Sequence, residues 1–160
     1  MSRKVRCVNP VYDFSTGWEE IKPQIWQWIM WNEVGEKVIG WIVTIREEEF
    51  VDRRTGEVRT NQVCYMITPE KEAVRFIVPT DLRYKLETLN ALLAQKKLGY
   101  DDVVVLIEYL GLEKTALGYN LKRFKVMRKL LHIPKDVKEA IPPLPVKGTE
   151  ENEIEEMIEF

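Results

Sequence analysis

The order of strand-like and helix-like segments is the feature that most restricts how this chain can fold. Five segments rich in β-branched and aromatic residues are bounded by polar turns containing Gly or Pro: Glu36–Arg46, Val58–Ile67, Ala73–Val78, Asp101–Tyr109 and Tyr119–Lys129. Between the third and fourth, leucines recur at helical spacing from the N-cap candidate Thr80 to the stop at Gly99. The order is therefore three strands, one helix and two strands.

This order excludes a doubly wound parallel sheet, in which strands alternate with helices. It predicts a mainly β fold, a five-stranded Greek-key barrel of the OB type with one helix between strands three and four. At 160 residues the chain has the length of one such domain with extensions. We predict an OB-fold nucleic-acid-binding domain over residues 36–132.

Two extensions flank the predicted barrel. Residues 1–35 hold four of the five tryptophans, including Trp18, and we expect this segment to pack on the barrel. Residues 133–160 begin with a proline-rich stretch that predicts a stiff, extended linker as far as Lys147. An acidic tail follows it.

The tail, Glu150 to Phe160, carries six glutamates and no basic residue, which predicts a disordered segment. All 24 Lys and Arg precede Thr149, so residues 1–148 have a net charge of +4, and the tail has −6. Such a tail is suited to capture by a basic partner, with Phe160 as the apolar anchor. Two alternatives are an ordinary frayed terminus and a short amphipathic helix after Thr149.

Catalysis finds little support in the sequence. His132 is the only histidine, and no phosphate loop, nucleophile motif or metal-ligand cluster is present. Asp101 and Asp102 are typical of a turn rather than of a metal site. We predict a protein that is not an enzyme and uses no cofactor or metal.

The two cysteines, Cys7 and Cys64, form no disulfide framework, which fits a reducing compartment. No apolar stretch reaches the length of a membrane span, and no leader peptide is evident at the start. The predicted location is the cytoplasm, with no membrane partner.

Basic side chains occupy the places where OB barrels bind oligonucleotides, the face of strands two and three and the loops joining strands one to two and four to five. A groove of cations with aromatic planes holds single strands without reading their sequence. The predicted nucleic-acid-binding residues are Arg46, Arg53, Arg54, Arg59, Tyr65, Arg75, Lys114, Tyr119, Lys122, Arg123 and Lys125.

Each candidate has a structural alternative. Trp41 shares a strand face with apolar residues, which favours a core position, and Tyr65 fits a core or a stacking role equally well. Trp26, Trp28 and Trp31 are further stacking candidates, although aromatic segments of this kind usually plug the end of a barrel. The strand arginines and lysines are also typical of edges protected against aggregation.

Several of these segments resemble the OB-fold single-stranded DNA-binding proteins of phages, archaeal viruses and mobile elements. The resemblance spans about Glu36 to Lys129 and rests on four stretches, 35–46, 76–82, 105–115 and 119–126. The tail is similar to the acidic, phenylalanine-ended C-termini of bacterial and T7-type single-stranded DNA-binding proteins. It lacks their run of aspartates ending in Ile-Pro-Phe, and the Trp-rich segment has no counterpart in them.

The resemblance implies a sequence-tolerant single-stranded DNA-binding protein acting in replication, recombination or repair, in the host cytoplasm if viral. The tail would compete for the DNA groove and recruit replication or repair proteins through Glu153, Glu155, Glu156, Ile158, Glu159 and Phe160. A homo-oligomer is compatible with this reading. The alternatives are a protein-interaction or virion-associated module without nucleic-acid binding, and an RNA-binding OB domain.

Overall fold

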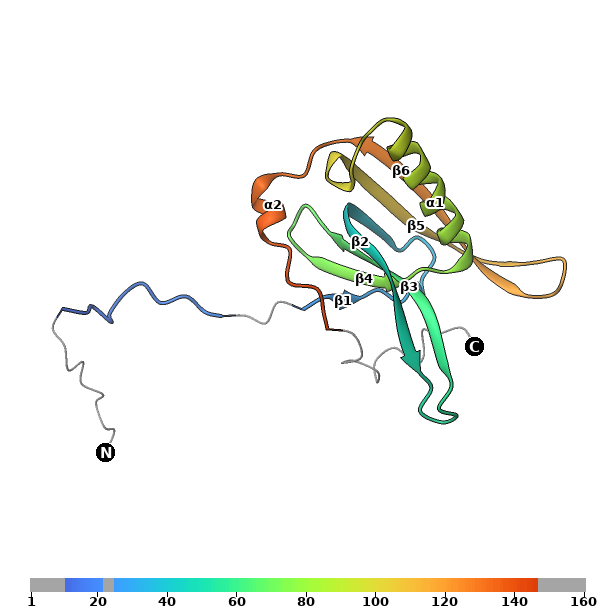
Figure 1. The fold of residues 1–160 in the computed structure, drawn as a ribbon, viewed down its shortest axis with the longest axis horizontal. Helices are drawn as coiled ribbons and strands as arrows, with labels where there is room; N and C mark the ends of the chain where they lie inside the picture. The colour runs from blue at the N-terminus through green and yellow to red at the C-terminus, as the bar shows by residue number, and fades with distance from the viewer. Residues whose placement is uncertain (1–10, 22–24, 147–160) are drawn as a thin grey trace.

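A computed structural model describes residues 11–21 and 25–146, which form one six-stranded sheet with helices at its side (Figure 1). The spatial order of the strands is β1-β4-β3-β2-β5-β6. The strands are β1 (Gln27–Trp28), β2 (Lys37–Val51), β3 (Val58–Ile67), β4 (Ala73–Ile77), β5 (Val103–Lys114) and β6 (Asn120–Leu130). The helices are α1 (Thr80–Gln95), the 3₁₀ turn η1 (Tyr100–Asp102) and α2 (Lys135–Glu139).

The predicted mainly β class and the predicted order of elements are confirmed. Each of the five expected strands is present, as β2 to β6, and α1 lies between the third and fourth of them. The sheet gains a sixth strand because β1 pairs in parallel with β4, whereas all other pairs are antiparallel. Among the described residues β1 and β6 remain opposite edges, so the sheet is a curled half-barrel rather than a closed five-stranded barrel.

The bend that curls the sheet is in β2. Residues Lys37 to Gly40 pair with β5, and from Trp41 onward the strand pairs with β3. A Cβ on Gly40 would lie 2.3 Å from the carbonyl oxygen of Ile67, a distance no side chain tolerates. Glycine is therefore required where β2 passes closely over the end of β3, which is a usual reason for a glycine inside a strand.

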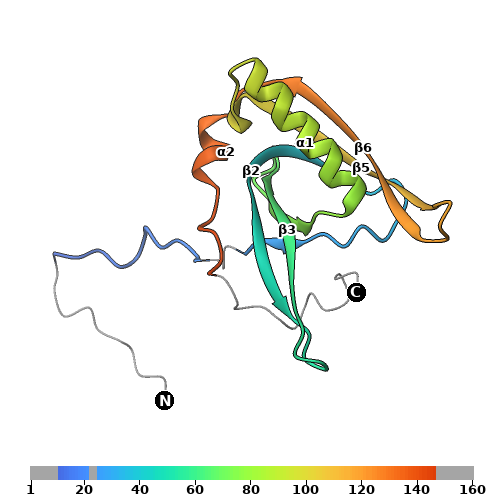
Figure 2. The same cartoon turned by 45° about the vertical axis from the view of Figure 1, so that its right-hand side comes forward.

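The inner face of the sheet, on the side of α1, carries the main hydrophobic core (Figure 2). Leu82, Leu86, Leu89 and Leu93 of α1 are buried there, at the helical spacing seen in the sequence. Phe76 and Phe124 both contact Trp31 edge to face, with ring centroids 5.2 Å apart in each pair. One aromatic cluster thus joins β4, β6 and the segment that precedes β2.

The outer face of β2, β3 and β4 carries a second hydrophobic cluster. Its strand residues include Trp41, Val63 and Tyr65, and the cover comes from Trp26 and from the segment around α2. Ile133 and Val137 are both buried in this cluster. Segments from both ends of the described chain therefore cover one sheet face.

The stretch that follows β6 differs from the extended linker that the prolines predict. Pro134 is the N-cap of α2, a position where its fixed φ is tolerated and its missing N–H costs nothing. Asp101 of η1 accepts hydrogen bonds from Ile133 N–H at 2.8 Å and from Lys138 Nζ at 2.8 Å. Residues 133–141 are therefore docked on the sheet, and the extended conformation begins only after them.

Candidate nucleic-acid interface

Two hairpin arms project from the body of the sheet and carry most of the exposed predicted binding residues (Figures 1 and 2). We define the first arm as residues 48–61, the paired ends of β2 and β3 with their turn, and the second arm as residues 111–122 of β5 and β6. The first turn is closed by Asp52 N–H donating to the Glu57 carbonyl at 2.8 Å. The second is closed by Thr115 N–H donating to the Tyr119 carbonyl at 2.7 Å.

The first arm presents three of the predicted arginines. Arg53 and Arg54 lie in the turn, where the Arg54 side chain is 88% exposed and only 4.0 Å from Asp52. Arg59 is half-buried on β3 and pairs with Glu57 at 3.5 Å. The turn arginines are thus the accessible cations of this arm.

The second arm combines exposed cationic and aromatic groups. Lys114 is exposed at the end of β5, and in the turn that follows Leu117 is 84% exposed and Tyr119 71%. Tyr119 is therefore the predicted stacking residue with an accessible ring. A cation next to a flat aromatic surface is the local combination that single-strand binding uses.

Arg46, Tyr65 and Arg75 lie together but inside the outer-face cluster. Arg46 donates to Glu48 Oε1 at 2.6 Å, to the Pro145 carbonyl at 2.6 Å and to the Tyr65 hydroxyl at 3.2 Å. Tyr65 is fully buried and itself donates to Glu48. Burial, together with Glu48, raises the pKa of Tyr65. Tyr65 therefore lies in the core, the alternative given for it above, and its ring is not accessible for stacking with a base.

Arg75 is only 4% exposed, and its guanidinium lies 4.1 Å from the centre of the Trp28 ring. This distance is well within the range of a cation–π contact, which strengthens when water is excluded. The side chain fixes β1 onto β4 rather than facing solvent. The prediction that Arg75 meets phosphates therefore does not fit this conformation.

The tryptophans proposed as additional stacking groups are mostly core residues. Trp41, Trp26 and Trp31 are each at least 95% buried. The indole N–H of Trp41 donates to the Leu131 carbonyl at 2.8 Å, and that of Trp26 donates to the Pro143 carbonyl at 3.0 Å. Trp28 is half-buried under Arg75. Their shared function is to close the two cores.

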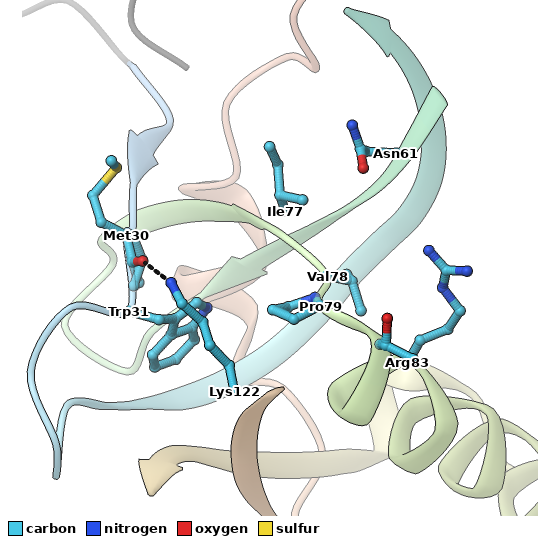
Figure 3. Close-up of a pocket in the computed structure, with 10 residues that line it drawn as sticks. Met30, Trp31, Asn61, Ile77, Val78, Pro79, Arg83 and Lys122 are labelled. Carbon is cyan, nitrogen blue, oxygen red and sulfur yellow. Dashed lines mark hydrogen bonds between the residues drawn. The ribbon is translucent and has the colours of Figure 1, made fainter. Parts of the chain in front are cut away.

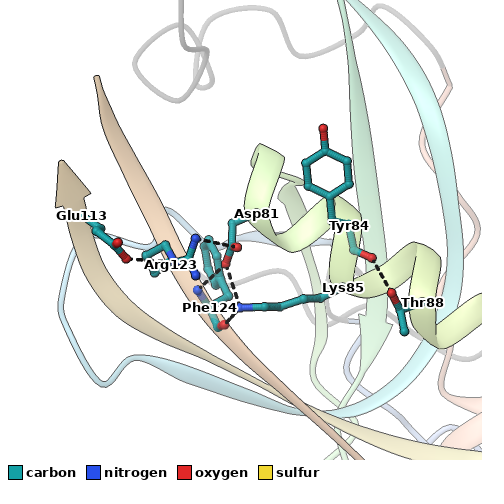
Figure 4. A network of polar contacts seen from close by, with 7 residues as sticks. All are labelled: Asp81, Tyr84, Lys85, Thr88, Glu113, Arg123 and Phe124. Carbon is teal, nitrogen blue, oxygen red and sulfur yellow. Dashed lines mark hydrogen bonds and ion pairs between the residues drawn. The ribbon is translucent and has the colours of Figure 1, made fainter. Parts of the chain in front are cut away.

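Arg123 belongs to a polar network that joins α1 to β6 (Figure 4). Its guanidinium pairs with Asp81 at 3.4 Å and with Glu113 at 3.2 Å. Asp81 also accepts hydrogen bonds from Lys85 Nζ at 3.0 Å and from Phe124 N–H at 2.9 Å, and Lys85 bonds the Phe124 carbonyl. Arg123 is thus a paired residue, whereas Lys125, two residues further along β6, is exposed.

Burial alone would raise the pKa of Asp81. The hydrogen bonds from Lys85 and Phe124 N–H, with the charges of Lys85 and Arg123, outweigh it, so the pKa of Asp81 lies below its ordinary value. The carboxylate is therefore ionised at neutral pH, as this network requires.

A pocket of about 170 Å³ lies between the bases of the two arms (Figure 3). It is lined by Asn61 at the base of the first arm, by Lys122 at the base of the second, and by the start of α1 with Arg83. Lys122 was predicted as a binding residue, but Asn61 and Arg83 were not. The sequence did offer a signal for Arg83. A cation in the first turn of a helix opposes the helix dipole, so its presence there is unusual and points to a role other than helix stability.

The remaining predictions concern the tail and metal binding. Glu153, Glu155, Glu156, Ile158, Glu159 and Phe160 lie outside the described residues. Within residues 11–21 and 25–146, no group of three His, Cys, Asp or Glu side chains is arranged to bind a metal ion. None of the helices in that part of the chain has the length and apolar character needed to cross a bilayer.

His132 and the two aspartates of η1 form surface contacts. His132 Nδ1 lies 3.0 Å from Asp102 Oδ1, and Gly99 N–H donates to the same carboxylate at 2.9 Å. The hydrogen bonds from Gly99 and His132 lower the pKa of Asp102. These contacts hold the turn that leads into β5. The sequence predicts a turn for this pair of aspartates.

Comparisons of the chain with protein-family models, curated proteins and solved structures found no match in any of the three.

Proposed function

We propose that this chain is a single-stranded DNA-binding protein of the OB type, which binds without reading sequence. The observation that carries the proposal is the placement of the two arms. The strand order β4-β3-β2-β5-β6, with α1 between β4 and β5, supports this proposal because it is compatible with an OB-type barrel left open at one side. In such barrels oligonucleotides lie between the loops that correspond to the tips of these two arms.

The side chains of the arms suit this ligand. Arg53 and Arg54 on one arm and Lys114 on the other offer exposed charges for phosphates, and Tyr119 offers a plane for a base. Contacts of this kind are made to groups common to all nucleotides, which favours tolerance of sequence. Lys125 on β6 extends the cationic surface. Arg46, Tyr65 and Arg75 support the sheet beneath it.

The proposal is tested by fluorescence anisotropy of labelled dT and rU oligonucleotides and of a DNA duplex, over a range of salt. We expect the dT strand to bind more tightly than the duplex, with log Kobs falling by about 0.7 per phosphate contact for each unit of log salt. Binding of rU with equal or greater affinity would favour an RNA-binding domain. Absence of single-strand binding at low salt would contradict the proposal.

A charge-matched pair of variants separates specific contacts from general attraction. Replacing Arg53 and Arg54 with Gln removes two cations from the first arm. Replacing Lys96 and Lys135 with Gln removes two exposed cations remote from both arms. We expect only the first variant to flatten the salt dependence. Equal losses from both would mean that net charge, rather than the arms, holds the strand.

The acidic tail enters the proposal as a competitor for the arms and as a recruiter of replication or repair proteins. Its charge of −6 against the +4 of residues 1–148 supports electrostatic competition. A chain ending at Gly148 should therefore bind dT more tightly than the full chain at low salt. Equal affinities would remove the competitive role while leaving DNA binding intact.

A second candidate function is protein interaction through the N-terminal segment. Tyr12, Phe14 and Trp18 are exposed, and their rings lie in a row with centroids 6.1 and 6.2 Å apart. An open aromatic surface of this kind is typical of protein contacts. Deleting residues 1–24 should leave DNA binding unchanged if the arms bind the strand.

A further inference from the structure

A groove of about 500 Å³ lies between α1 and the edge strand β6, where the two elements run alongside each other (Figures 1 and 2). Its lining is mostly apolar and comes from α1, from β6 and from Leu110 of β5. Leu110 is 47% exposed and Met127 of β6 is 51% exposed. A volume of this size is within the range of sites that bury a ligand. The groove therefore has room for an apolar segment.

One side of the groove is the free edge of β6. Phe124 N–H donates to Asp81 at 2.9 Å and its carbonyl accepts from Lys85, so these backbone groups point away from β5 (Figure 4). Backbone groups alternate in direction along an antiparallel strand, so those of Val126 and Arg128 point the same way. Within the described part of the chain they have no hydrogen-bond partner on that side. They can pair with an added strand, a mode of binding in which main-chain hydrogen bonds supply the affinity.

The charges around the groove favour an acidic occupant. Lys125 and Arg128 line it, and none of its ten lining residues is acidic. Neither cation forms an ion pair with any of the described residues. The strand β6 as a whole carries five basic residues and no acidic one. Like charges on facing strands repel, so the β6 edge of a second copy is a poor partner, whereas an acidic strand is a good one.

The chain itself contains a segment of this chemistry. Residues 150–160 carry six glutamates and no basic residue. Successive side chains of an extended strand point to opposite faces. This alternation would place Ile154, Ile158 and Phe160 on one face and Glu153, Glu155 and Glu159 on the other. One apolar face with a row of carboxylates opposite matches an apolar groove that has cations on its rim.

The tail is long enough to reach the groove. The Pro145 carbonyl accepts from Arg46 on β2 at 2.6 Å, which locates the chain shortly before the tail. Arg46 lies six residues from Gly40, about 20 Å along a strand, and Gly40 lies opposite Arg128 across β5, about 10 Å away. The path from Arg46 to Arg128 is thus about 30 Å. Residues 146–158 span about 43 Å when fully extended.

We propose that the groove between α1 and β6 binds residues 153–160 of this chain's own acidic tail, as an extended strand added to the free edge of β6. The apolar face of the tail packs on the groove, and its glutamates face Lys125 and Arg128. This site is separate from the two arms and shares only Lys125 with the predicted nucleic-acid-binding residues. The inference therefore stands apart from the proposed DNA binding.

The first test follows the five methionine methyl signals of the ¹³C-labelled full chain by NMR, with Met127→Leu identifying the one in the groove. A full chain with Ile158→Ser and Phe160→Ser keeps every charge of the tail but loses two of its apolar groups. We expect the Met127 signal to differ between the wild type and this tail variant. The Val126 and Arg128 N–H groups should exchange with solvent about tenfold faster in the variant.

The second test titrates a synthetic peptide of residues 149–160 into the tail variant, with a scrambled peptide of the same composition as control. The natural sequence should return the Met127 signal to its wild-type position in a saturable manner. Arg128→Gln should weaken this binding up to about fivefold, the range of a partly exposed ion pair. Lys135→Gln, 91% exposed on α2 and outside the groove, should leave it unchanged.

Neither test contains DNA, so each gives its result whether or not the chain binds a strand. Equal binding of the scrambled peptide overturns the inference, as do identical Met127 signals and exchange rates in the wild type and the tail variant. A Met127 shift that grows with protein concentration assigns the groove to the tail of a second copy and overturns it too. A shift with oligo-dT and none with the peptide assigns the groove to nucleic acid, with the same consequence.

Discussion

The two faces of the sheet are both buried, but by different means. On the inner face, α1 supplies leucines at helical spacing to strands that present apolar and aromatic side chains. On the outer face, short irregular segments cover a surface that includes Arg46, Tyr65 and Arg75. The inner face needs only packing, whereas the outer face also needs each polar group to be paired.

This difference explains why strand residues of the outer face resemble binding residues. Arg46 is satisfied by Glu48, Tyr65 and the carbonyl of Pro145, which is 99 residues away in the chain. A period-two pattern shows that the Arg46 side chain lies on a given face, but not what covers that face. The same pattern serves a solvent-exposed binding face and a face covered by a distant segment.

The largest effect should come from the inner face. Phe76→Ala removes a fully buried ring that contacts Trp31, and the resulting cavity should lower the free energy of unfolding by about 3–5 kcal/mol. Urea denaturation measures this loss. Phe14→Ala, at an exposed position of the N-terminal segment, should change it by less than about 0.5 kcal/mol. A Phe76→Ala loss below about 1 kcal/mol would mean that the inner face is not closely packed.

The polar link between α1 and β6 should rank second. Asp81→Asn leaves Lys85 and Arg123 without their shared carboxylate and should cost about 2 kcal/mol. The control is Asp136→Asn, whose carboxylate forms an exposed pair with Lys71 at 3.5 Å. Its loss should be small, as is usual for surface pairs.

The same variant gives a pH test. Because the pKa of Asp81 is lowered in the folded state, its contribution is complete above the unfolded value near 3.9 and is lost as pH falls through the folded pKa. The wild-type chain should therefore lose part of its stability as the pH falls below about 4, and Asp81→Asn should lack this part. If the free energy of unfolding of the two proteins changed with pH in the same way, the acid sensitivity would not come from Asp81.

On the outer face, Arg75 distinguishes a supporting role from a binding role. Arg75→Ala removes the contact with Trp28 and should lower the free energy of unfolding by about 1–2 kcal/mol. Arg54→Ala, in the exposed turn, should leave stability unchanged and weaken strand binding instead. A variant Arg75→Ala that keeps full stability but loses DNA affinity would reverse the assignment made from its burial.

The fold was more predictable from the sequence than the candidate site. Local periodicity and turn residues identify β2 to β6 and α1, because those elements depend on neighbours within a few positions. The two-residue strand β1 has no such pattern, since its pairing with β4 depends on a contact 47 positions away. The helix α2 follows Pro134 in a proline-rich stretch, where composition outweighed the local pattern of buried Ile133 and Val137.

The residues of the pocket were only partly predictable for the same reason. Lys122 stood out as one of several cations on a strand, while Asn61 and Arg83 have ordinary neighbours in sequence. They come together because the curl of the sheet brings the base of the first arm, the base of the second arm and the start of α1 to one place. Among the aromatic candidates, Tyr119 is exposed because it lies at the hairpin tip, where none of the other described segments covers it.

The smallest effect should come from the segment that crosses the outer face. A chain ending at Ile141 loses the Pro143 and Pro145 carbonyls that accept from Trp26 and Arg46. A chain ending at Val146 keeps both, so the difference between the two truncations isolates residues 142–146. We expect the shorter chain to be less stable by about 1 kcal/mol in urea, because each hydrogen bond contributes about 0.5–1.5 kcal/mol and water replaces part of it. Equal stabilities would show that Trp26 and Arg46 find other acceptors, and that the outer face, unlike the inner one, does not depend on its cover.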